Sequence, residues 1–287
     1  MRLQIAGFIV EVNCDERVVG QMPNYLPFIA SETEQGDVLC RIDVGCTLPD
    51  ETTVPDIVQY IDGKELSIWL RSGYCSVSLK FHNGAFLYRL RADRNWTYIQ
   101  TDWVPGNPDS LWVLNDFIMI AFIYSAAFHH TVLVHASSVV VSGEGCAFVG
   151  PSGVGKSTHS RLWLQYIPGA WLLNDDQPVL RYMPDGRVCI YGSPWSGKTP
   201  CYENAKARLR RLYFMKQASS NRLLPLDGVQ VFQKLMVATS LIGRDTFSFS
   251  AISETLAKIA GVVCGYVLEN RPEREAALLS YEVFVED

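Results

Sequence analysis

The segment from Gly150 to Ser157 carries the clearest chemical signal in the sequence. It reads Gly-Pro-Ser-Gly-Val-Gly-Lys-Ser, which fits the pattern G-x-x-x-x-G-K-[ST] between an apolar run and an apparent helix. The glycines allow a loop whose backbone N–H groups converge on phosphate oxygens, and the dipole of the following helix adds positive potential. Without a ligand the same residues would be a glycine-rich turn. The pattern and its context favour a loop that binds ATP.

Two side chains of this loop have expected roles. Lys156 would hold the β- and γ-phosphates, and the Ser157 hydroxyl would reach Mg²⁺. The predicted nucleotide-binding residues are Gly150, Ser152, Gly153, Val154, Gly155, Lys156, Ser157 and Thr158.

Two adjacent acids, Asp175 and Asp176, are the next carboxylates along the chain, nineteen and twenty residues beyond Lys156. They follow the apolar run "AWLL" and Asn174. In a parallel sheet that strand could lie beside the phosphate-loop strand, with its carboxyl end at the same edge. One carboxylate could then ligate Mg²⁺ while its neighbour accepts the proton of an attacking hydroxyl. A pair of turn or helix-cap aspartates is the alternative interpretation.

The elements that would position these groups fall into two parts. Residues 1–107 carry short alternating runs separated by turn residues, beginning with a strand-like run at the start of the chain and including Asn83-Gly84 between two such runs. This predicts a mostly antiparallel, β-rich domain whose role stays open. Residues 108–287 are predicted to form an α/β domain with strands over 131–141 and 146–150 and helices near 156–166, 228–239, 250–262 and 272–283.

Composition excludes several other classes of protein. The formal net charge of the 287 residues is −5, which argues against a broad nucleic-acid-binding surface. The apolar segment 111–130 carries Asn115 and Asp116 near its start and predicts a buried helix, capped by Asp109 or Ser110, rather than a membrane span. The eight cysteines form no CxxC pair, and the first residues lack a signal-peptide cleavage site, so we expect reduced thiols in a cytoplasmic protein.

Three features together resemble a known family. They are a strand with a histidine ("LVHASSVVV"), a hairpin leading into "GPSGVGKST", and "NDD" after the next strand. This arrangement is similar to the C-terminal catalytic domain of HPr kinase/phosphorylase, and closer still to HPr-kinase-related proteins described as serine kinases or as phosphoenolpyruvate-carboxykinase-like. The resemblance covers residues 130–200 well, the remainder to 287 loosely, and the first hundred residues not at all.

The resemblance implies roles for individual residues. Asp175 matches the general base that activates a serine hydroxyl, Asp176 matches the acid associated with the metal, and His135 matches the histidine near the phosphate acceptor. From its sequence context alone, His135 would be a buried strand residue. Lys198 falls in a loop where a second cation could contact the transferred phosphoryl group, although a surface lysine is an equally simple reading. Tyr191 stands where the family has an arginine, which argues against HPr recognition and against the reverse phosphorolysis.

These observations together predict an α/β phosphate-loop kinase domain of the HPr kinase/phosphoenolpyruvate carboxykinase type with a mixed sheet. The expected reaction moves the γ-phosphoryl group of ATP, with Mg²⁺, to a hydroxyl, most simply that of a serine in a protein, a peptide or a small molecule. A carboxykinase acting on oxaloacetate and a nucleotide-dependent regulatory module without transfer activity are the two alternatives. The expected partners include no nucleic acid and no membrane, and the hexameric state of HPr kinases leaves a homo-oligomer open.

Overall fold

The computed structural model describes residues 1–31, 36–61, 63–82, 84, 86–197, 199–239, 241 and 245–286. The chain divides into two compact units, Met1–His129 with Ile242–Ser248 and His130–Leu241 with Phe249–Asp287. The boundary predicted at 107/108 therefore differs from the observed division by about one helix, because the long apolar helix α2 (Ser110–Ala127) belongs to the first unit.

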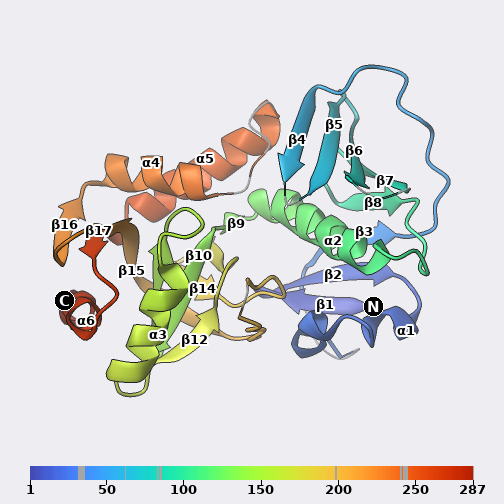
Figure 1. Cartoon of the computed structure of the whole chain (residues 1–287). Helices are drawn as coiled ribbons and strands as arrows, with labels where there is room; N and C mark the ends of the chain where they lie inside the picture. Colours follow the sequence, from blue (N-terminus) through green and yellow to red (C-terminus); the bar gives the residue numbers. More distant parts are fainter. Residues whose placement is uncertain are drawn as a thin grey trace. The chain divides into compact units, whose positions relative to one another are not determined.

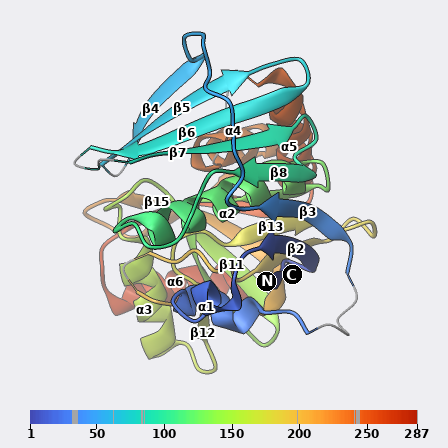
Figure 2. The same ribbon diagram turned by 90° about the vertical axis from the view of Figure 1, so that its right-hand side faces the viewer.

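An eight-stranded sheet forms most of the first unit (Figures 1 and 2), with the strand order β1-β2-β3-β8-β7-β6-β5-β4. Five of its seven neighbouring pairs are antiparallel, while the β2–β3 and β3–β8 pairs are parallel. This part of the chain is thus β-rich and mainly antiparallel, as the sequence predicted. Its elements are β1 (Arg2–Ile5), β2 (Phe8–Asn13), α1 (Glu16–Val19), the 3-10 helix η1 (Pro23–Phe28), β3 (Val38–Asp43), β4 (Ile57–Ile61), β5 (Lys64–Leu70), β6 (Tyr74–Phe81), β7 (Leu87–Asp93), β8 (Tyr98–Thr101) and α2.

The first apolar run is a hairpin rather than the single strand that the sequence predicted. Ala6 and Gly7 both have positive φ, 51° and 82°, and they join β1 to β2 as a two-residue turn. Positive φ at both positions matches the twist of antiparallel strands. The predicted β6–β7 hairpin is present, with Lys80 paired to Leu87, although Asn83 lies outside the described residues.

Helix α2 is held in the first unit by polar contacts as well as by apolar packing on β3 and β7. Lys64 lies 2.6 Å from Asp116, and Asn24 donates a hydrogen bond of 3.0 Å to Asn115. These contacts tie α2 to β5 and to η1 of the same unit. Asp109 takes the N-cap position but makes no capping hydrogen bond with its side chain. By length and composition α2 is the one helix among the described residues that could cross a membrane, and most of it is buried.

The second unit is built on a nine-stranded mixed sheet, so the chain is α/β as predicted. The strand order is β12-β10-β11-β15-β14-β13-β9, and β17 pairs with both β15 and β16. Its elements are β9 (Thr131–Leu133), β10 (Ala136–Val141), β11 (Glu144–Val149), α3 (Lys156–Tyr166), β12 (Trp171–Asn174), β13 (Val179–Tyr182), β14 (Val188–Tyr191), β15 (Lys206–Gln217), β16 (Arg222–Leu226), α4 (Gly228–Ala238), α5 (Thr246–Ala260), β17 (Cys264–Asn270) and α6 (Arg274–Val285).

The predicted strand over 131–141 is interrupted in the structure. Its first part, β9, pairs with β13, whereas its second part, β10, pairs with β11 and β12. The chain changes partners at Val134 and His135, so His135 lies in a break between strands instead of inside one.

An aromatic cluster anchors helix α3 to the sheet. Phe148 of β11 packs against Trp163 of α3 and Tyr213 of β15, with ring centroids 5.6 Å apart in both pairs. All three side chains are fully buried. Helix α6 packs beside α3 (Figure 1), and Ser280 of α6 accepts a hydrogen bond from the indole N–H of Trp163. This packing fixes the start of α3 at the edge of the sheet where β11 ends.

Candidate functional site

The segment between β11 and α3 forms the predicted glycine-rich loop, and α3 begins at Lys156. Gly153 and Gly155 have φ angles of 81° and 108°, which L-residues rarely adopt, and no atom lies within 4 Å of where their β-carbons would be. These two glycines are therefore required by backbone conformation. At Gly150 the requirement is crowding, because a β-carbon there would lie 2.9 Å from a methyl group of Val154.

The side chain of Lys156 folds back over this loop. Its Nζ donates hydrogen bonds to the carbonyl oxygens of Gly150 (2.8 Å) and Pro151 (3.1 Å). Burial lowers the pKa of Lys156 from its ordinary value, while attraction to the carboxylates of Asp176 and Asp175 acts in the opposite direction. The ammonium group thus lies inside the loop and within electrostatic reach of both acids.

The remaining loop residues differ in exposure. Ser152, Gly153 and Thr158 are exposed, and Ser157 is half-buried in the first turn of α3. Gln217, the last residue of β15, donates a 3.2 Å hydrogen bond to the carbonyl oxygen of Gly153. The loop therefore keeps accessible surface while one side of it is tied to the sheet.

Asp175 and Asp176 lie at the same edge of the sheet as the loop, but the strand that precedes them has a different position in the sheet from the predicted one. Strand β12 does not lie beside β11, since β10 lies between them and runs antiparallel to both. Two strands on either side of a common antiparallel neighbour run in the same direction, so β11 and β12 end at the same edge. Ala136 of β10 lies next to both ends. It pairs with Val149, the last residue of β11, and its N–H donates a hydrogen bond of 3.0 Å to the carbonyl oxygen of Asp176, which follows β12.

Asn174 shapes the turn that carries the acids, a role that was not predicted from the sequence. Its Oδ1 accepts hydrogen bonds from the backbone N–H groups of Asp176 (2.9 Å) and Gln177 (2.8 Å). Its Nδ2 donates to the carbonyl oxygens of Ser193 and Trp195. An asparagine at the end of an apolar run is a recognisable signal for such a turn.

The two acids occupy different environments. Asp175 is only 4% exposed, and its Oδ1 accepts a 2.9 Å hydrogen bond from the hydroxyl of Ser137. The Ser137 hydroxyl in turn lies 2.6 Å from the hydroxyl of Ser160 on α3. Because Ser157 precedes Ser160 by three residues, the two lie on the same face of the helix. Asp175 is therefore held on the side of the sheet that faces α3, the helix whose first turn contains Ser157.

Asp176 lies closer to solvent and pairs with His135. The His135 Nε2 and Asp176 Oδ1 atoms are 3.2 Å apart, and each side chain is about one-third exposed. The break between β9 and β10 places His135 there, and its backbone N–H donates to the carbonyl oxygen of Ala238 (2.8 Å). The structure thus brings together two residues that are 41 positions apart in the sequence.

A loop between β14 and β15 closes over the acid pair. A β-carbon at Gly197 would lie 3.3 Å from both the Asp175 carbonyl oxygen and the Asp176 β-carbon, so the loop backbone approaches the pair closely. The Thr199 hydroxyl accepts a hydrogen bond from Arg161 of α3 at 3.3 Å. Lys198 stands between these two residues in the sequence but lies outside the described residues.

The described residues contain no group of three or more histidine, cysteine or acidic side chains that could hold a metal ion by itself. The hydroxyl of Ser157 and one carboxylate of the Asp175–Asp176 pair, together with phosphate oxygens, would nevertheless be a suitable ligand set for Mg²⁺, which keeps several waters and takes few protein ligands. A metal at this site would therefore depend on the nucleotide.

Comparison of the chain with protein-family models and with curated proteins gave no match.

Proposed function

We propose that this protein is an ATP- and Mg²⁺-dependent phosphotransferase that moves the γ-phosphoryl group to a hydroxyl, that of a serine in a protein, a peptide or a small molecule. The observation that carries the proposal is geometric: the Lys156 ammonium lies in a glycine-rich loop that follows β11, and Asp175 and Asp176 follow β12 at the same edge of the sheet. A cation for the phosphates and a pair of acids for the metal and the acceptor then share one space. The resemblance to the HPr kinase catalytic domain supports the same reaction.

The sequence predicts that Asp175 is the base and Asp176 the metal ligand, but the geometry favours the opposite assignment. Asp175 is buried on the side of α3 that carries Ser157, and this position suits a metal ligand shared with the Ser157 hydroxyl. Asp176 is open to solvent and is oriented by His135, a position that suits a base which must meet an incoming hydroxyl. We therefore assign the metal to Asp175 and proton acceptance to Asp176.

Each remaining group has a definite role in this proposal. Lys156 exchanges its two loop carbonyls for phosphate oxygens, and the loop N–H groups hold the phosphates in place. His135 keeps the Asp176 carboxylate turned toward the acceptor. Mg²⁺ would neutralise charge on the phosphates, and Ser157 and Asp175 would hold it.

The test combines calorimetric titration of the protein with ATP and Mg²⁺ and an assay with γ-labelled ATP, free serine and a library of serine-containing peptides. We expect transfer of label to a product with the acid stability of a phosphoserine. Asp176→Asn should lower transfer by about 10²–10⁴-fold while ATP binding persists, whereas Asp175→Asn should mainly raise the Mg²⁺ concentration required.

Other outcomes would point elsewhere. Oxaloacetate-dependent turnover would support the carboxykinase. Binding of ATP without any transfer or hydrolysis would support a regulatory module. Failure to bind ATP with Mg²⁺ at millimolar concentration would remove the basis of the proposal.

A further inference from the structure

The first unit holds a cavity that the phosphotransfer proposal does not use. It lies on one face of strands β5, β6 and β7, where Trp69 pairs with Ser76 and Ser76 pairs with Arg91 across the strands. Directly opposite residues of neighbouring strands share a face, so these three side chains form one row. The alternate residue Ile68 is fully buried on the other face.

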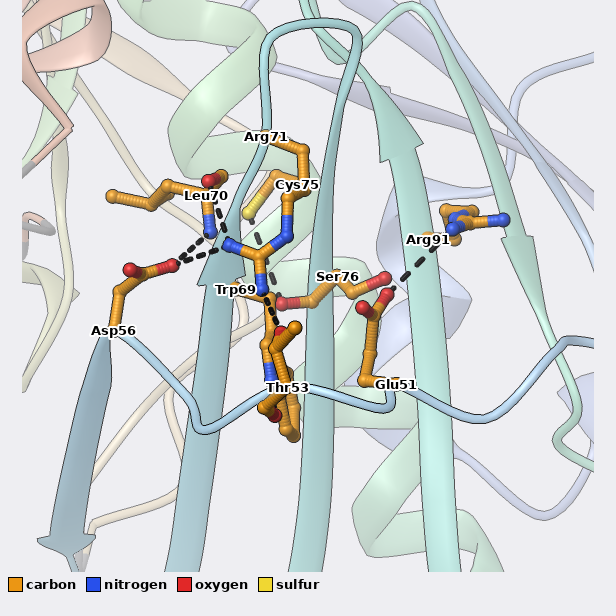
Figure 3. Close-up of polar contacts among 9 residues, drawn as sticks. All are labelled: Glu51, Thr53, Asp56, Trp69, Leu70, Arg71, Cys75, Ser76 and Arg91. Atoms are coloured by element: carbon orange, nitrogen blue, oxygen red, sulfur yellow. Dashed lines mark hydrogen bonds and ion pairs between the residues drawn. The ribbon is translucent and has the colours of Figure 1, made fainter.

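A strap of chain, residues 48–56, crosses this polar face (Figure 3) and is tied to β5. The indole N–H of Trp69 donates to the carbonyl oxygen of Thr53 at 2.8 Å. The carboxylate of Asp56 accepts hydrogen bonds of 2.8 Å from the Leu70 N–H and from the Arg71 guanidinium. The strap is therefore an ordered segment that covers this face of the strands.

Between the strap and the strands lies a cavity of about 270 Å³. Its volume is close to the lower end of the range for small-molecule sites. Serine side chains leave space that larger residues of a strand would fill. The cavity is lined by Leu48, Pro49, Asp50, Glu51, Trp69, Ser76, Val77, Ser78, Leu87, Arg89, Leu90 and Arg91.

Two polar groups in this lining lack hydrogen-bond partners. Glu51 Oε1 and Arg91 Nε are buried, and neither finds a partner among the described residues. Glu51 Oε1 lies 3.6 Å from the nearest guanidinium nitrogen of Arg91, a distance at which the charges attract but do not form a good hydrogen bond (Figure 3). The ring of Tyr74 holds the guanidinium in place, 3.7 Å from the ring centroid. Nearly all buried polar groups in folded proteins have a hydrogen-bond partner, so these two call for a water or a ligand that completes them.

The charges in the lining cancel. Arg89 pairs with Asp50 at 2.5 Å, and Arg91 pairs with Glu51. A charged ligand would have to compete with these ion pairs, whereas a neutral ligand could add to them. The lining thus offers an acceptor, a donor, hydroxyls and an aromatic ring to an uncharged molecule that carries many hydrogen-bonding groups.

We propose that this cavity binds a neutral saccharide of about monosaccharide size. A sugar hydroxyl donates to Glu51 Oε1, another accepts from Arg91 Nε, and the apolar C–H face of the ring packs on Trp69. Ser76 and Ser78 contribute further hydroxyls at the base of the cavity. The site is independent of the phosphate loop, so its test does not depend on the proposed kinase activity.

The test is calorimetric titration of the full chain, without nucleotide, against D-glucose, D-galactose, D-mannose and D-ribose up to about 10 mM. Saturation-transfer NMR would identify the sugar protons that contact the protein. We expect at least one sugar to bind. Ser76→Val should weaken its binding at least tenfold, because a β-branched side chain is accommodated in a strand and fills the cavity. Trp69→Leu is a second variant that removes the aromatic face.

Ser67→Val is the matched control. Ser67 pairs with Ser78 in a neighbouring row of the same sheet but does not line the cavity, so its replacement should change sugar affinity less than twofold. The proposal is overturned if none of the four sugars binds, if both cavity variants bind as well as the unchanged protein, or if the cavity takes up a zwitterionic amino acid such as serine and no sugar.

Discussion

Replacing Ser137 with alanine tests how Asp175 is held. Ser137 is fully buried on β10, donates a 2.9 Å hydrogen bond to the Asp175 carboxylate, and lies 2.6 Å from the Ser160 hydroxyl. Alanine keeps the β-carbon and removes only the hydroxyl. The variant therefore leaves a carboxylate oxygen in the interior without the donor that faces it.

The expected loss of stability comes almost entirely from the carboxylate. A hydrogen bond to a charged group contributes about 1.5–3 kcal/mol. Ser160 loses its contact as well, but a helical serine can bond to the carbonyl group one turn back, so this second loss is small. We expect Ser137→Ala to lower the free energy of unfolding by about 2 kcal/mol, and a less firmly held Asp175 to raise the Mg²⁺ concentration for half-maximal activity about tenfold, equivalent to about 1.4 kcal/mol.

The assay is urea unfolding, with hydrogen exchange of the β10 amides to report on the second unit, and a Mg²⁺ titration of phosphotransfer or ATP hydrolysis. Ser138→Ala is the control. Ser138 is its equally buried neighbour but donates to the neutral carbonyl oxygen of Asn174 at 3.3 Å, so its loss should cost under about 1 kcal/mol.

A double-mutant cycle isolates the interaction with the charge. In an Asp175→Asn background the acceptor is neutral, and the cost of Ser137→Ala should fall by about 1 kcal/mol or more. Equal costs for Ser137→Ala and Ser138→Ala, or an unchanged cost in the Asp175→Asn background, would refute the reasoning.

Three further predictions concern the loop and its helix. Gly155→Ala forces an L-residue to a φ of 108° and should cost about 1–3 kcal/mol and weaken ATP binding in calorimetry, whereas Gly169→Ala, at a φ of 76° in the turn after α3, should lower stability without changing ATP affinity. Lys156→Met should weaken ATP binding by more than about 30-fold, about 2 kcal/mol, while urea unfolding of the nucleotide-free protein shows no comparable loss, because burial already lowers the pKa of this lysine. Burial lowers the pKa of His159 from 6.5 to about 3, so on acidification the unfolded chain takes up a proton that the folded chain does not. The free energy of unfolding should therefore fall by about 2 kcal/mol between pH 7 and pH 5. Urea unfolding of His159→Leu should lack this part of the pH dependence.

The local parts of the site were predictable from the sequence, because their physical causes are local. Glycines at positions that need positive φ, followed by a helix, define a loop within a few residues of sequence, and the predicted helix over 156–166 matches α3.

The long-range parts were not predictable in this way. Residues 131–141 have the composition of one continuous strand, and nothing in their sequence shows that the chain leaves β13 and joins β11 and β12 at His135. That change of partner depends on strands up to fifty residues away, and it is what brings His135 to Asp176. The position of β10 between β11 and β12 is likewise a property of the whole sheet. The apolar segment 111–130 was correctly predicted to hold a buried helix, but the residues that it contacts in the first unit, such as Lys64 and Asn24, lie far away in the chain.

The acid pair shows most clearly where prediction from residue type ends. Two adjacent aspartates are chemically identical in the sequence, so only a resemblance could assign one to the metal and the other to the base. In the folded chain, neighbouring residues at the end of a strand point in different directions. Asp175 turns toward Ser137 and helix α3, and Asp176 turns toward His135 and solvent. If burial and partners decide the roles, Asp175→Asn and Asp176→Asn must fail differently, the first in the response to Mg²⁺ and the second in the proton transfer at saturating Mg²⁺. Identical defects in both variants would show that the two environments do not separate the two roles.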